Sequence, residues 1–500
     1  MKRITIMILL AFFTYLNINA SSLEVDSTLT RIDNLLERTA NRQGVPGISV
    51  AITGYAPETI FSSYGVTRRG EEILVDEETF FGLGSLSKAF SALSILYLDR
   101  NEEFDFKIED PIQKHLPWLN FYHQDADFKM EELTIANFIY HTSGLVNAVH
   151  SLQLPPSEGL DAAQRIIESL NDSRLEFRPG TKYDYASSNY IILGLVIQNV
   201  TGLSFEEFTT TRILQPLNLN NTFMFQSEAE TVGVMASAHK PIWFASRPFN
   251  PPTFRAHTPT GFIISNASDM MNWLKLNLNP DSAPAPFDEL IERALEANLT
   301  VDAWQGYHYA AGWLVGVETS TIRHQGESPG FASEVVMLPD SGIGVVVLMN
   351  SIAGDTANLI ANILLILDGQ EVDTISIGNI DFILFDMVFS IISILAILVS
   401  IILIFLIIRK ILKIKRRAAI DKKLKMKNYV NLLLAALFFM SFLILATLFP
   451  SFFGVGTWEI VNIWMSYSVF MGFVLIIITC FIWVVLALLG VILDNPKIKV

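Results

Sequence analysis

The segment Phe80-Phe-Gly-Leu-Gly-Ser85-Leu-Ser-Lys88-Ala-Phe90 places a Ser-x-x-Lys pair after a Gly-rich turn, at the start of an apolar helix. Residues three positions apart share one face of a helix, so the Ser85 hydroxyl and the Lys88 amine can meet. Serine is a weak nucleophile until a base removes its proton, and burial can lower the pKa of a lysine enough for it to act as that base. The sequence therefore predicts Ser85 as a candidate nucleophile.

Two other segments compete with Ser85. Ser237-Ala-His-Lys240 repeats the spacing without the Gly-rich turn, and we interpret it as a chance match. Gly326-Glu-Ser-Pro-Gly330 matches the G-x-S-x-G pattern, whose oxyanion hole uses the backbone N–H of the residue after the serine. Here that residue is Pro329, which has no N–H, and no histidine follows it because His324 is the last in the chain. The G-x-S-x-G match is therefore not interpreted as a nucleophile site.

The remainder of residues 21–366 mixes strands and helices. Gly47–Ile52 and Gly342–Met349 are short apolar runs rich in β-branched residues, which predicts buried strands. Ser85–Tyr97 and Ser188–Asn199 have the apolar faces of helices. Strands near both ends with helices between them predict an α/β sandwich whose middle is largely helical.

Further patches follow one another in a fixed order. They are His141-Thr-Ser-Gly-Leu145, Tyr185-Ala-Ser187 within 178–194, Pro216-Leu-Asn-Leu-Asn-Asn-Thr222, and His324-Gln-Gly326 followed by Ser328-Pro-Gly-Phe-Ala-Ser333. From about residue 30 to residue 352, their order and spacing resemble the class C β-lactamases, penicillin-binding proteins and esterase-like serine hydrolases. The resemblance implies an α/β fold, a class C β-lactamase-like sandwich of an antiparallel sheet flanked by helices, with a mainly helical lobe.

The resemblance also implies roles for the matched residues. Ser85 would be the acylated nucleophile, Lys88 would hold or accept its proton, and Tyr185 would be a second base. The backbone N–H groups of Ser85 and Glu327 would form the oxyanion hole. The implied substrate-binding positions are Ser187, His324 and Gly326. We expect no metal, since the eight histidines show neither H-x-H nor H-E-x-x-H spacing, and no cofactor, since the sequence has no Walker or dinucleotide-binding glycine motif.

Two positions depart from the family pattern. Ser187 stands where the family has asparagine, and a hydroxyl cannot present the separate donor and acceptor of an amide. His324 stands where many members have lysine, which replaces a permanent cation by one that titrates. We therefore expect peptide or ester hydrolysis rather than efficient β-lactam hydrolysis. His141 is interpreted as structural. Tyr307, His308 and Tyr309 are interpreted as either the rim of the site or the core.

The C-terminal part predicts three transmembrane helices, at residues 387–408, 429–449 and 466–493. About 20 apolar residues suffice to cross the hydrocarbon core. None of these runs contains Asp, Glu, Lys, Arg or His, so we interpret the bundle as an anchor rather than a transport path. Membrane lipid is therefore an expected partner.

Charge and the N-terminus orient this anchor. Residues 1–20 have the basic start, short apolar run and small final residue of a signal peptide. Ten basic residues and one acidic residue lie between Arg409 and Lys427, which predicts a cytoplasmic loop. The predicted order is signal peptide 1–20, extracytoplasmic hydrolase domain 21–366, stalk 367–386, first span 387–408, basic cytoplasmic loop 409–428, second span 429–449, extracytoplasmic loop 450–465, third span 466–493 and cytoplasmic tail 494–500.

Composition excludes several classes of function. The net charge is −15, and residues 21–386 alone carry 47 acidic and 21 basic residues. This part lacks the basic footprint of a nucleic-acid binder. The single cysteine, Cys480, excludes intramolecular disulfides and a cysteine-based zinc site.

The main hypothesis is a serine hydrolase, held in the cell membrane by three spans, that acts through a Ser85 acyl-enzyme. Its expected substrates are D-amino-acid peptides of the cell wall or small esters, with β-lactams as a further small-molecule partner. One alternative is a cell-wall or β-lactam sensor that acylates slowly or only binds. Another is an interaction scaffold with a vestigial pocket, against which the intact Ser85, Lys88 and Tyr185 argue.

Overall fold

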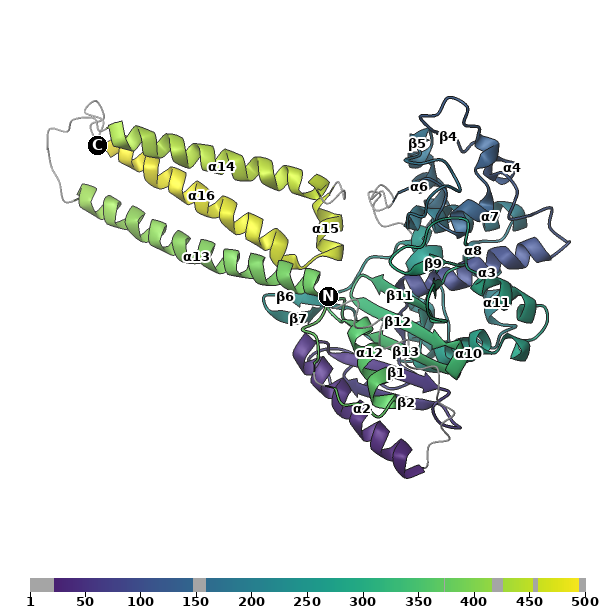
Figure 1. Ribbon diagram of the computed structural model, residues 1–500. Coiled ribbons are helices and arrows are strands. Elements are labelled where there is room, and N and C mark those ends of the chain that lie inside the picture. The colour runs from purple at the N-terminus through teal and green to yellow at the C-terminus, as the bar shows by residue number, and fades with distance from the viewer. Residues whose placement is uncertain (1–21, 147–158, 373, 416–425, 453–456, 494–500) are drawn as a thin grey trace. The chain divides into compact units, whose positions relative to one another are not determined.

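The computed structural model describes residues 22–146, 159–372, 374–415, 426–452 and 457–493 (Figure 1). The predicted signal peptide, the middle of the basic loop and the C-terminal tail lie outside the described residues. The chain divides into two compact units. The globular unit comprises residues 1–240 and 246–379, and the membrane unit comprises residues 241–245 and 380–500.

A seven-stranded antiparallel sheet forms the centre of the globular unit, in the order β2-β1-β13-β12-β11-β10-β9 (Figure 1). Its strands are β1 (Gly47–Thr53), β2 (Ile60–Gly65), β9 (Tyr307–Tyr309), β10 (Leu314–Gly316), β11 (Ile322–Ser328), β12 (Phe331–Leu338) and β13 (Ile343–Met349). Three small pairs accompany it: β3 (Phe81–Gly82) with β8 (Ile264–Ser265), β4 (Phe121–Tyr122) with β5 (Ser173–Arg174), and β6 (His239–Ile242) with β7 (Ala245–Pro248).

Helices cover both faces of this sheet, which explains why its central strands are apolar throughout. Side chains alternate between the two faces of a strand. Along β13, Val345 and Val347 enter one core with α2 (Ser22–Gln43) and α12 (Thr356–Leu367), whereas Val346 enters the core on the other face. A strand buried on both faces has no polar alternation.

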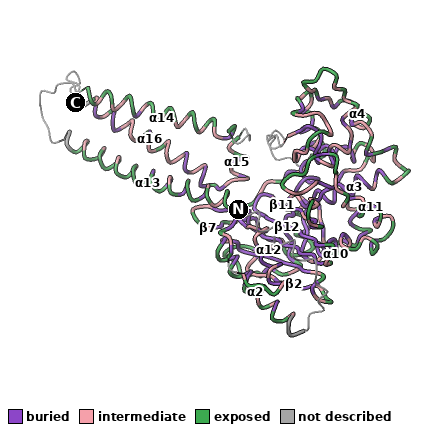
Figure 2. Tube along the Cα trace, viewed as in Figure 1, coloured by how far each residue is buried: buried purple, intermediate pink, exposed green. Residues whose placement is uncertain are grey.

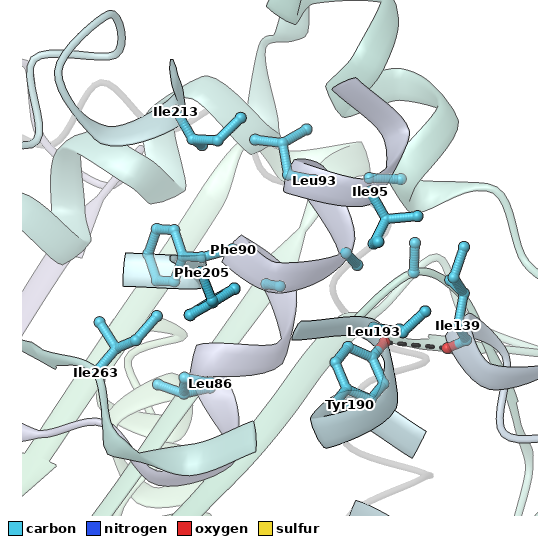
Figure 3. Packing of buried hydrophobic residues seen from close by; sticks show 14 of the residues in the cluster. Leu86, Phe90, Leu93, Ile95, Ile139, Tyr190, Leu193, Phe205, Ile213 and Ile263 are labelled. Carbon is cyan, nitrogen blue, oxygen red and sulfur yellow. Dashed lines mark hydrogen bonds between the residues drawn. The ribbon is translucent and has the colours of Figure 1, made fainter. Parts of the chain in front are cut away.

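The second core joins the sheet to a helical lobe that contains α3 (Ser87–Arg100) and α7 (Ser187–Thr201). Figure 3 shows Leu86, Phe90 and Leu93 of the α3 region among side chains of the lobe, and the Tyr190 hydroxyl of α7 donates to the Ile139 carbonyl at 3.0 Å. The other helices of the globular unit are α4 (Ile112–His115), α5 (Ile135–Ile139), α6 (Ala162–Leu170), α8 (Phe205–Thr209), α9 (Gln226–Val232), α10 (Ala267–Leu278) and α11 (Phe287–Leu295). Because α3 is packed into this core, its first turn, which carries Lys88, is held in a fixed orientation.

The expected sandwich is confirmed. The two predicted strands are β1 and β13, which pair with each other at the centre of the sheet. The predicted helices are α7 and, after one 3₁₀ turn over Gly84–Leu86, α3. Local sequence does not show that the first and last strands are neighbours, because that pairing joins residues about 300 positions apart.

Three helices of the described membrane unit are long and apolar enough to cross a membrane. They are α13 (Ile380–Lys415), α14 (Met426–Phe452) and α16 (Tyr467–Leu493), and the short helix α15 (Trp458–Trp464) precedes the last of them. Helix α16 packs against both α13 and α14. Figure 2 shows exposed residues along α13 and α14, as expected for side chains that face lipid. Helix α13 begins at Ile380, so it includes Asp386, which the sequence places in the stalk.

Candidate active site

Ser85 lies in a tight turn between the short strand β3 and helix α3. Gly84, just before it, has a φ of +53°, and a Cβ atom there would lie 2.3 Å from the backbone nitrogen of Glu327. Only glycine tolerates both this conformation and this approach. The turn is thereby pressed against β11. Gly326 makes the matching contact from that strand, since a Cβ there would lie 2.1 Å from the Leu83 carbonyl oxygen.

This packing brings together the two backbone groups expected to form the oxyanion hole. Ser85 follows Gly84 directly, and the Glu327 nitrogen lies against Gly84. The Ser333 hydroxyl of β12 donates to the Leu83 carbonyl at 2.6 Å and so ties the sheet to the same turn. The arrangement can support two converging N–H donors, the geometry that stabilises a tetrahedral oxyanion.

Lys88 is fully buried and faces the nucleophile. Its Nζ atom lies 3.1 Å from the Ser85 Oγ atom and donates to the Thr260 carbonyl at 2.6 Å. Burial lowers the pKa of Lys88 to about 7, because an ammonium loses its hydration there. Near neutral pH a large share of the amine is therefore neutral and able to accept a proton. The role of Thr260 could not be predicted from the sequence, because the acceptor is its backbone carbonyl, a group that every residue has.

Tyr185 lies beside this pair, just before α7. The Lys88 Nζ atom is 4.9 Å from the centre of its ring. Burial raises the pKa of Tyr185 well above its usual range, and the neighbouring Ser85 hydroxyl offsets this rise in part. Within the described residues the Tyr185 hydroxyl has no hydrogen bond of normal geometry. At neutral pH Tyr185 is thus a protonated phenol next to the nucleophile.

His141 holds Tyr185 in place. Its Nδ1 atom accepts hydrogen bonds from the Ala186 backbone nitrogen at 3.2 Å and from the Asn189 amide at 2.9 Å. Its ring centre lies 4.4 Å from that of Tyr185. Burial lowers the pKa of His141 well below its usual value, so the ring is neutral. This side chain therefore has the structural role that the sequence suggests.

His324 is buried on β11. Its Nδ1 atom donates to the Gln325 carbonyl at 2.7 Å, which leaves Nε2 to accept from the Tyr309 hydroxyl at 3.3 Å. Burial, reinforced by the nearby Lys88, lowers the pKa of His324 to about 3. At neutral pH the imidazole is therefore uncharged, and the expected role of His324 in substrate binding stays a prediction. Tyr309, which the sequence leaves between rim and core, is buried against this imidazole.

The remaining predicted positions have simpler surroundings. Ser187 is the first residue of α7 and is half-buried. Ser328, the serine of the G-x-S-x-G match, is buried at the end of β11. Among the described residues, no three His, Cys, Asp or Glu side chains come close enough together to hold a metal ion.

The sheet, the two helical layers and the Ser-x-x-Lys pair define the architecture of serine β-lactamases and penicillin-binding proteins. Residues 32–368 match the Beta-lactamase family, and the chain belongs to that family.

Individual relatives are distant. Over 327 residues the chain is 25% identical to "Protein flp" of Staphylococcus aureus (strain NCTC 8325 / PS 47), covering 64% of this chain and 62% of that protein. It is 24% identical to a "Beta-lactamase" of Pseudomonas fluorescens, covering 64% of this chain and 92% of that protein. In structure it resembles the octameric penicillin-binding protein homologue from Pyrococcus abyssi, with a TM-score of 0.58 and 22% identity over 72% of this chain and 81% of that one.

Proposed function

We propose that this chain is a membrane-anchored serine hydrolase that acts through a Ser85 acyl-enzyme on small esters or on D-amino-acid peptides of the cell wall. The observation that carries the proposal is the buried Lys88 amine, 3.1 Å from the Ser85 hydroxyl, with a pKa of about 7. Membership of the Beta-lactamase family and the name of the Pseudomonas fluorescens relative support hydrolysis as the reaction.

In the acylation step, the Ser85 Oγ atom attacks the substrate carbonyl carbon while the neutral Lys88 amine accepts the hydroxyl proton. The developing negative charge on the carbonyl oxygen is stabilised by the N–H groups of Ser85 and Glu327. When the bond to the leaving group breaks, the protonated Tyr185 phenol donates its proton to the leaving oxygen or nitrogen. Lys88 then returns a proton to Tyr185, and the acyl-enzyme remains.

Deacylation uses the same groups in the opposite direction. Lys88, acting directly or through Tyr185, accepts a proton from the attacking water, and the acyl carbon leaves Ser85 as a carboxylic acid. The Ser85 oxygen regains its proton from the lysine. Because Tyr185 is neutral at neutral pH, Lys88 is the primary base in both steps, and the tyrosine passes the proton on.

The neutral His324 influences the choice of substrate. It offers no positive charge to a substrate carboxylate, since its pKa is about 3. The aromatic rings of Tyr185 and Tyr309 lie beside it, with ring centres 6.2 and 6.0 Å away. This environment favours uncharged esters and internal peptide bonds over substrates that present a free carboxylate.

A second candidate function is a sensor that acylates and then turns over slowly. Ser187 favours it, because the family's asparagine is missing at the position where its amide would orient the substrate. A slow or incomplete deacylation would leave the acyl-enzyme as a signal rather than an intermediate.

Labelling of the purified full-length protein tests both functions. We expect a fluorophosphonate probe to label wild type, and Ser85→Ala to lose the label. A fluorescent penicillin reports β-lactam acylation in the same samples. Loss of the penicillin label within minutes indicates a hydrolase, and a label that persists for hours indicates a sensor. A folded wild-type protein that takes neither label would refute the acyl-enzyme.

The proposed topology places the globular unit outside the cytoplasm and the basic loop inside. The three apolar helices and the ten basic residues between Arg409 and Lys427 support it. A cysteine-accessibility scan in a Cys480→Ser background checks the orientation. Reaction of a cysteine near Arg409 with an impermeant reagent in intact cells would reverse the model.

A further inference from the structure

A short irregular turn of the globular unit, Thr258–Phe262, supplies the carbonyl that the Lys88 amine contacts. The Thr260 carbonyl accepts a hydrogen bond from the Lys88 Nζ atom at 2.6 Å. Gly261 interrupts the turn with backbone angles that no helix uses, and Pro259 has no N–H to donate within it. The position of the Thr260 carbonyl therefore depends on contacts with neighbouring elements.

Helix α3, which carries Lys88, holds the first half of this turn through Ser91. The two residues are three positions apart, so their side chains share a face of the helix. The Ser91 hydroxyl donates to the Pro259 carbonyl at 2.6 Å and lies 3.2 Å from the Ser87 carbonyl of its own helix, so the shorter contact is the one to the turn. Ser91 is fully buried, and a buried hydroxyl without a partner is costly. This hydrogen bond therefore fixes the residue before Thr260 against α3.

Ser87 holds the other end of the turn. Its hydroxyl accepts from the Ile263 backbone nitrogen at 3.1 Å and donates to the Gly84 carbonyl at 2.7 Å. Ser87 is also fully buried. The two hydrogen bonds that α3 makes to the turn and its end thus lie on either side of Thr260 along the chain.

Helix α7 packs against the same turn. A Cβ atom at Gly194 of α7 would lie 2.5 Å from the Pro259 ring, so the helix approaches that ring directly. The turn contacts both α3 and α7. Packing against α7 limits its movement, and the hydroxyls of Ser87 and Ser91 attach it to α3.

The contact with Thr260 affects how Lys88 can act as a base. A neutral amine has one lone pair, which must point at the Ser85 hydroxyl to accept its proton. An N–H bond that is directed at the Thr260 carbonyl fixes one direction of the tetrahedral nitrogen and so limits where the lone pair points. The same carbonyl stabilises the protonated amine, because it accepts a hydrogen bond from the ammonium.

No charged side chain of the described residues competes with this carbonyl. Burial keeps the titratable side chains around the Lys88 Nζ atom neutral at neutral pH, because it raises the pKa of the tyrosines and lowers the pKa of the histidines. These side chains are Tyr185, Tyr190, His141 and His324. The orientation of the amine therefore depends on the Thr260 carbonyl and on Ser85.

We propose that Ser91 is a positioning residue that holds the Thr260 carbonyl against the Lys88 amine. Through this contact the amine is directed toward Ser85, and Ser87 assists at the far end of the turn. Ser91 acts through the turn and is not itself a catalytic residue. The inference rests on the proposed acyl-enzyme, because the direction of the amine matters only if Lys88 takes the Ser85 proton.

The test uses the full-length protein with a p-nitrophenyl ester, and measures kcat, KM and the pH profile of kcat/KM from pH 5 to 9. We expect Ser91→Ala to lower kcat about tenfold with KM within about twofold, because a small displacement of a catalytic group slows the reaction while the substrate contacts remain. The low-pH inflection should move down by about half a unit or more, because a displaced carbonyl stabilises the ammonium less. Ser91→Cys keeps a weak donor and should give values between those of wild type and Ser91→Ala.

Ser94→Ala is the matched control. Ser94 lies on the same helix, is equally buried, and has hydroxyl contacts outside the turn, with the Phe90 carbonyl at 2.9 Å and the Thr209 hydroxyl at 3.0 Å. Both alanine variants lose a buried hydrogen bond, so both should lower the thermal midpoint by about 2–4 °C. Only Ser91→Ala should change kcat and the pH inflection.

Two results overturn the inference. Ser91→Ala could keep the wild-type kcat and pH inflection while its thermal midpoint falls, which would limit Ser91 to a role in stability. Ser94→Ala could also change both kinetic values as far as Ser91→Ala does. If Ser91→Ala fails to fold, Ser91→Cys decides the question by the same two measurements. A wild-type protein whose Ser85 takes no fluorophosphonate label would instead refute the proposed function, and this inference with it.

Discussion

The chain contains two Ser-x-x-Lys segments, and their comparison shows what makes such a pair reactive. Both lysines are buried, and burial lowers the pKa of Lys88 to about 7 and that of Lys240 to about 8. Lys88 follows Ser85 by one helical turn, and their polar atoms meet at 3.1 Å. Lys240 lies on β6 with its Nζ atom 4.4 Å from the centre of the Phe249 ring. Three positions along an extended chain place side chains on opposite faces, so this spacing does not bring a serine and a lysine together as a helix does.

A lowered lysine pKa therefore does not identify a catalytic base by itself. Desolvation produces it wherever an amine is buried. The helix places Lys88 next to the Ser85 hydroxyl, and the turn at Gly84 places Ser85 next to the Glu327 nitrogen of β11, the proposed second oxyanion donor. The following predictions test this difference between the two segments.

Substitution of the two serines should give the largest contrast. Ser85→Ala removes the nucleophile, and we expect kcat/KM for a p-nitrophenyl ester to fall by at least ~10³, as in other enzymes that lose a serine nucleophile. Ser237→Ala should remain within about twofold of wild type. Steady-state kinetics on the full-length proteins measure both. A large loss in Ser237→Ala would show that the second segment takes part in the chemistry.

Substitution of the two lysines should give the next largest contrast. Lys88→Met removes the base and should lower kcat by ~10²–10⁴. Lys240→Met keeps most of the buried volume and should change kcat by less than about twofold. Comparable damage from both substitutions would contradict the assignment of Lys88 alone as the base. Circular dichroism at each pH used confirms that the variants are folded.

The pH dependence of the reaction should report only one of the lysines. The neutral amine of Lys88 is the active form, so kcat/KM should rise about tenfold per pH unit below pH ~7 and level off above it. A profile of log kcat/KM against pH from 5 to 9 measures this. Lys240→Met should have the same profile. A second inflection near pH 8 that disappears in this variant would show that Lys240 also takes part in the reaction.

The stability of the protein should report both lysines, with the smallest effect. An unfolded lysine keeps its proton up to its usual pKa of 10.5, whereas the buried forms lose it above about 7 and about 8. Between these values the unfolded state binds more protons, so stability rises with pH, by at most about 1.4 kcal/mol per unit for each lysine. The thermal midpoint from pH 7 to 10 should rise in wild type and rise less steeply in Lys88→Met and in Lys240→Met. Equal slopes in all three proteins would contradict burial as the cause.

Much of the fold can be predicted because its signals are local. The apolar runs of the three membrane helices, the two central strands β1 and β13 and the apolar faces of α3 and α7 each come from one continuous stretch of sequence. The start of α13 is different. Ile380–Asp386 belongs to the predicted stalk, and it contains two carboxylates. Only the structure shows how Asp386 is accommodated in a helix: it accepts hydrogen bonds from the Ser468 hydroxyl of α16 and from the Phe244 backbone nitrogen between β6 and β7.

The site divides in the same way. Ser85 and Lys88 meet because of their spacing on one helix, and that much is a property of the sequence alone. The rest depends on segments that are distant along the chain. The neutrality of His324 comes from desolvation by surrounding elements, and the Pro259 carbonyl next to Thr260 is held by Ser91, 168 positions earlier in the chain. Spacing along one helix is fixed by backbone geometry, whereas burial and long-range contacts exist only once the layers have packed.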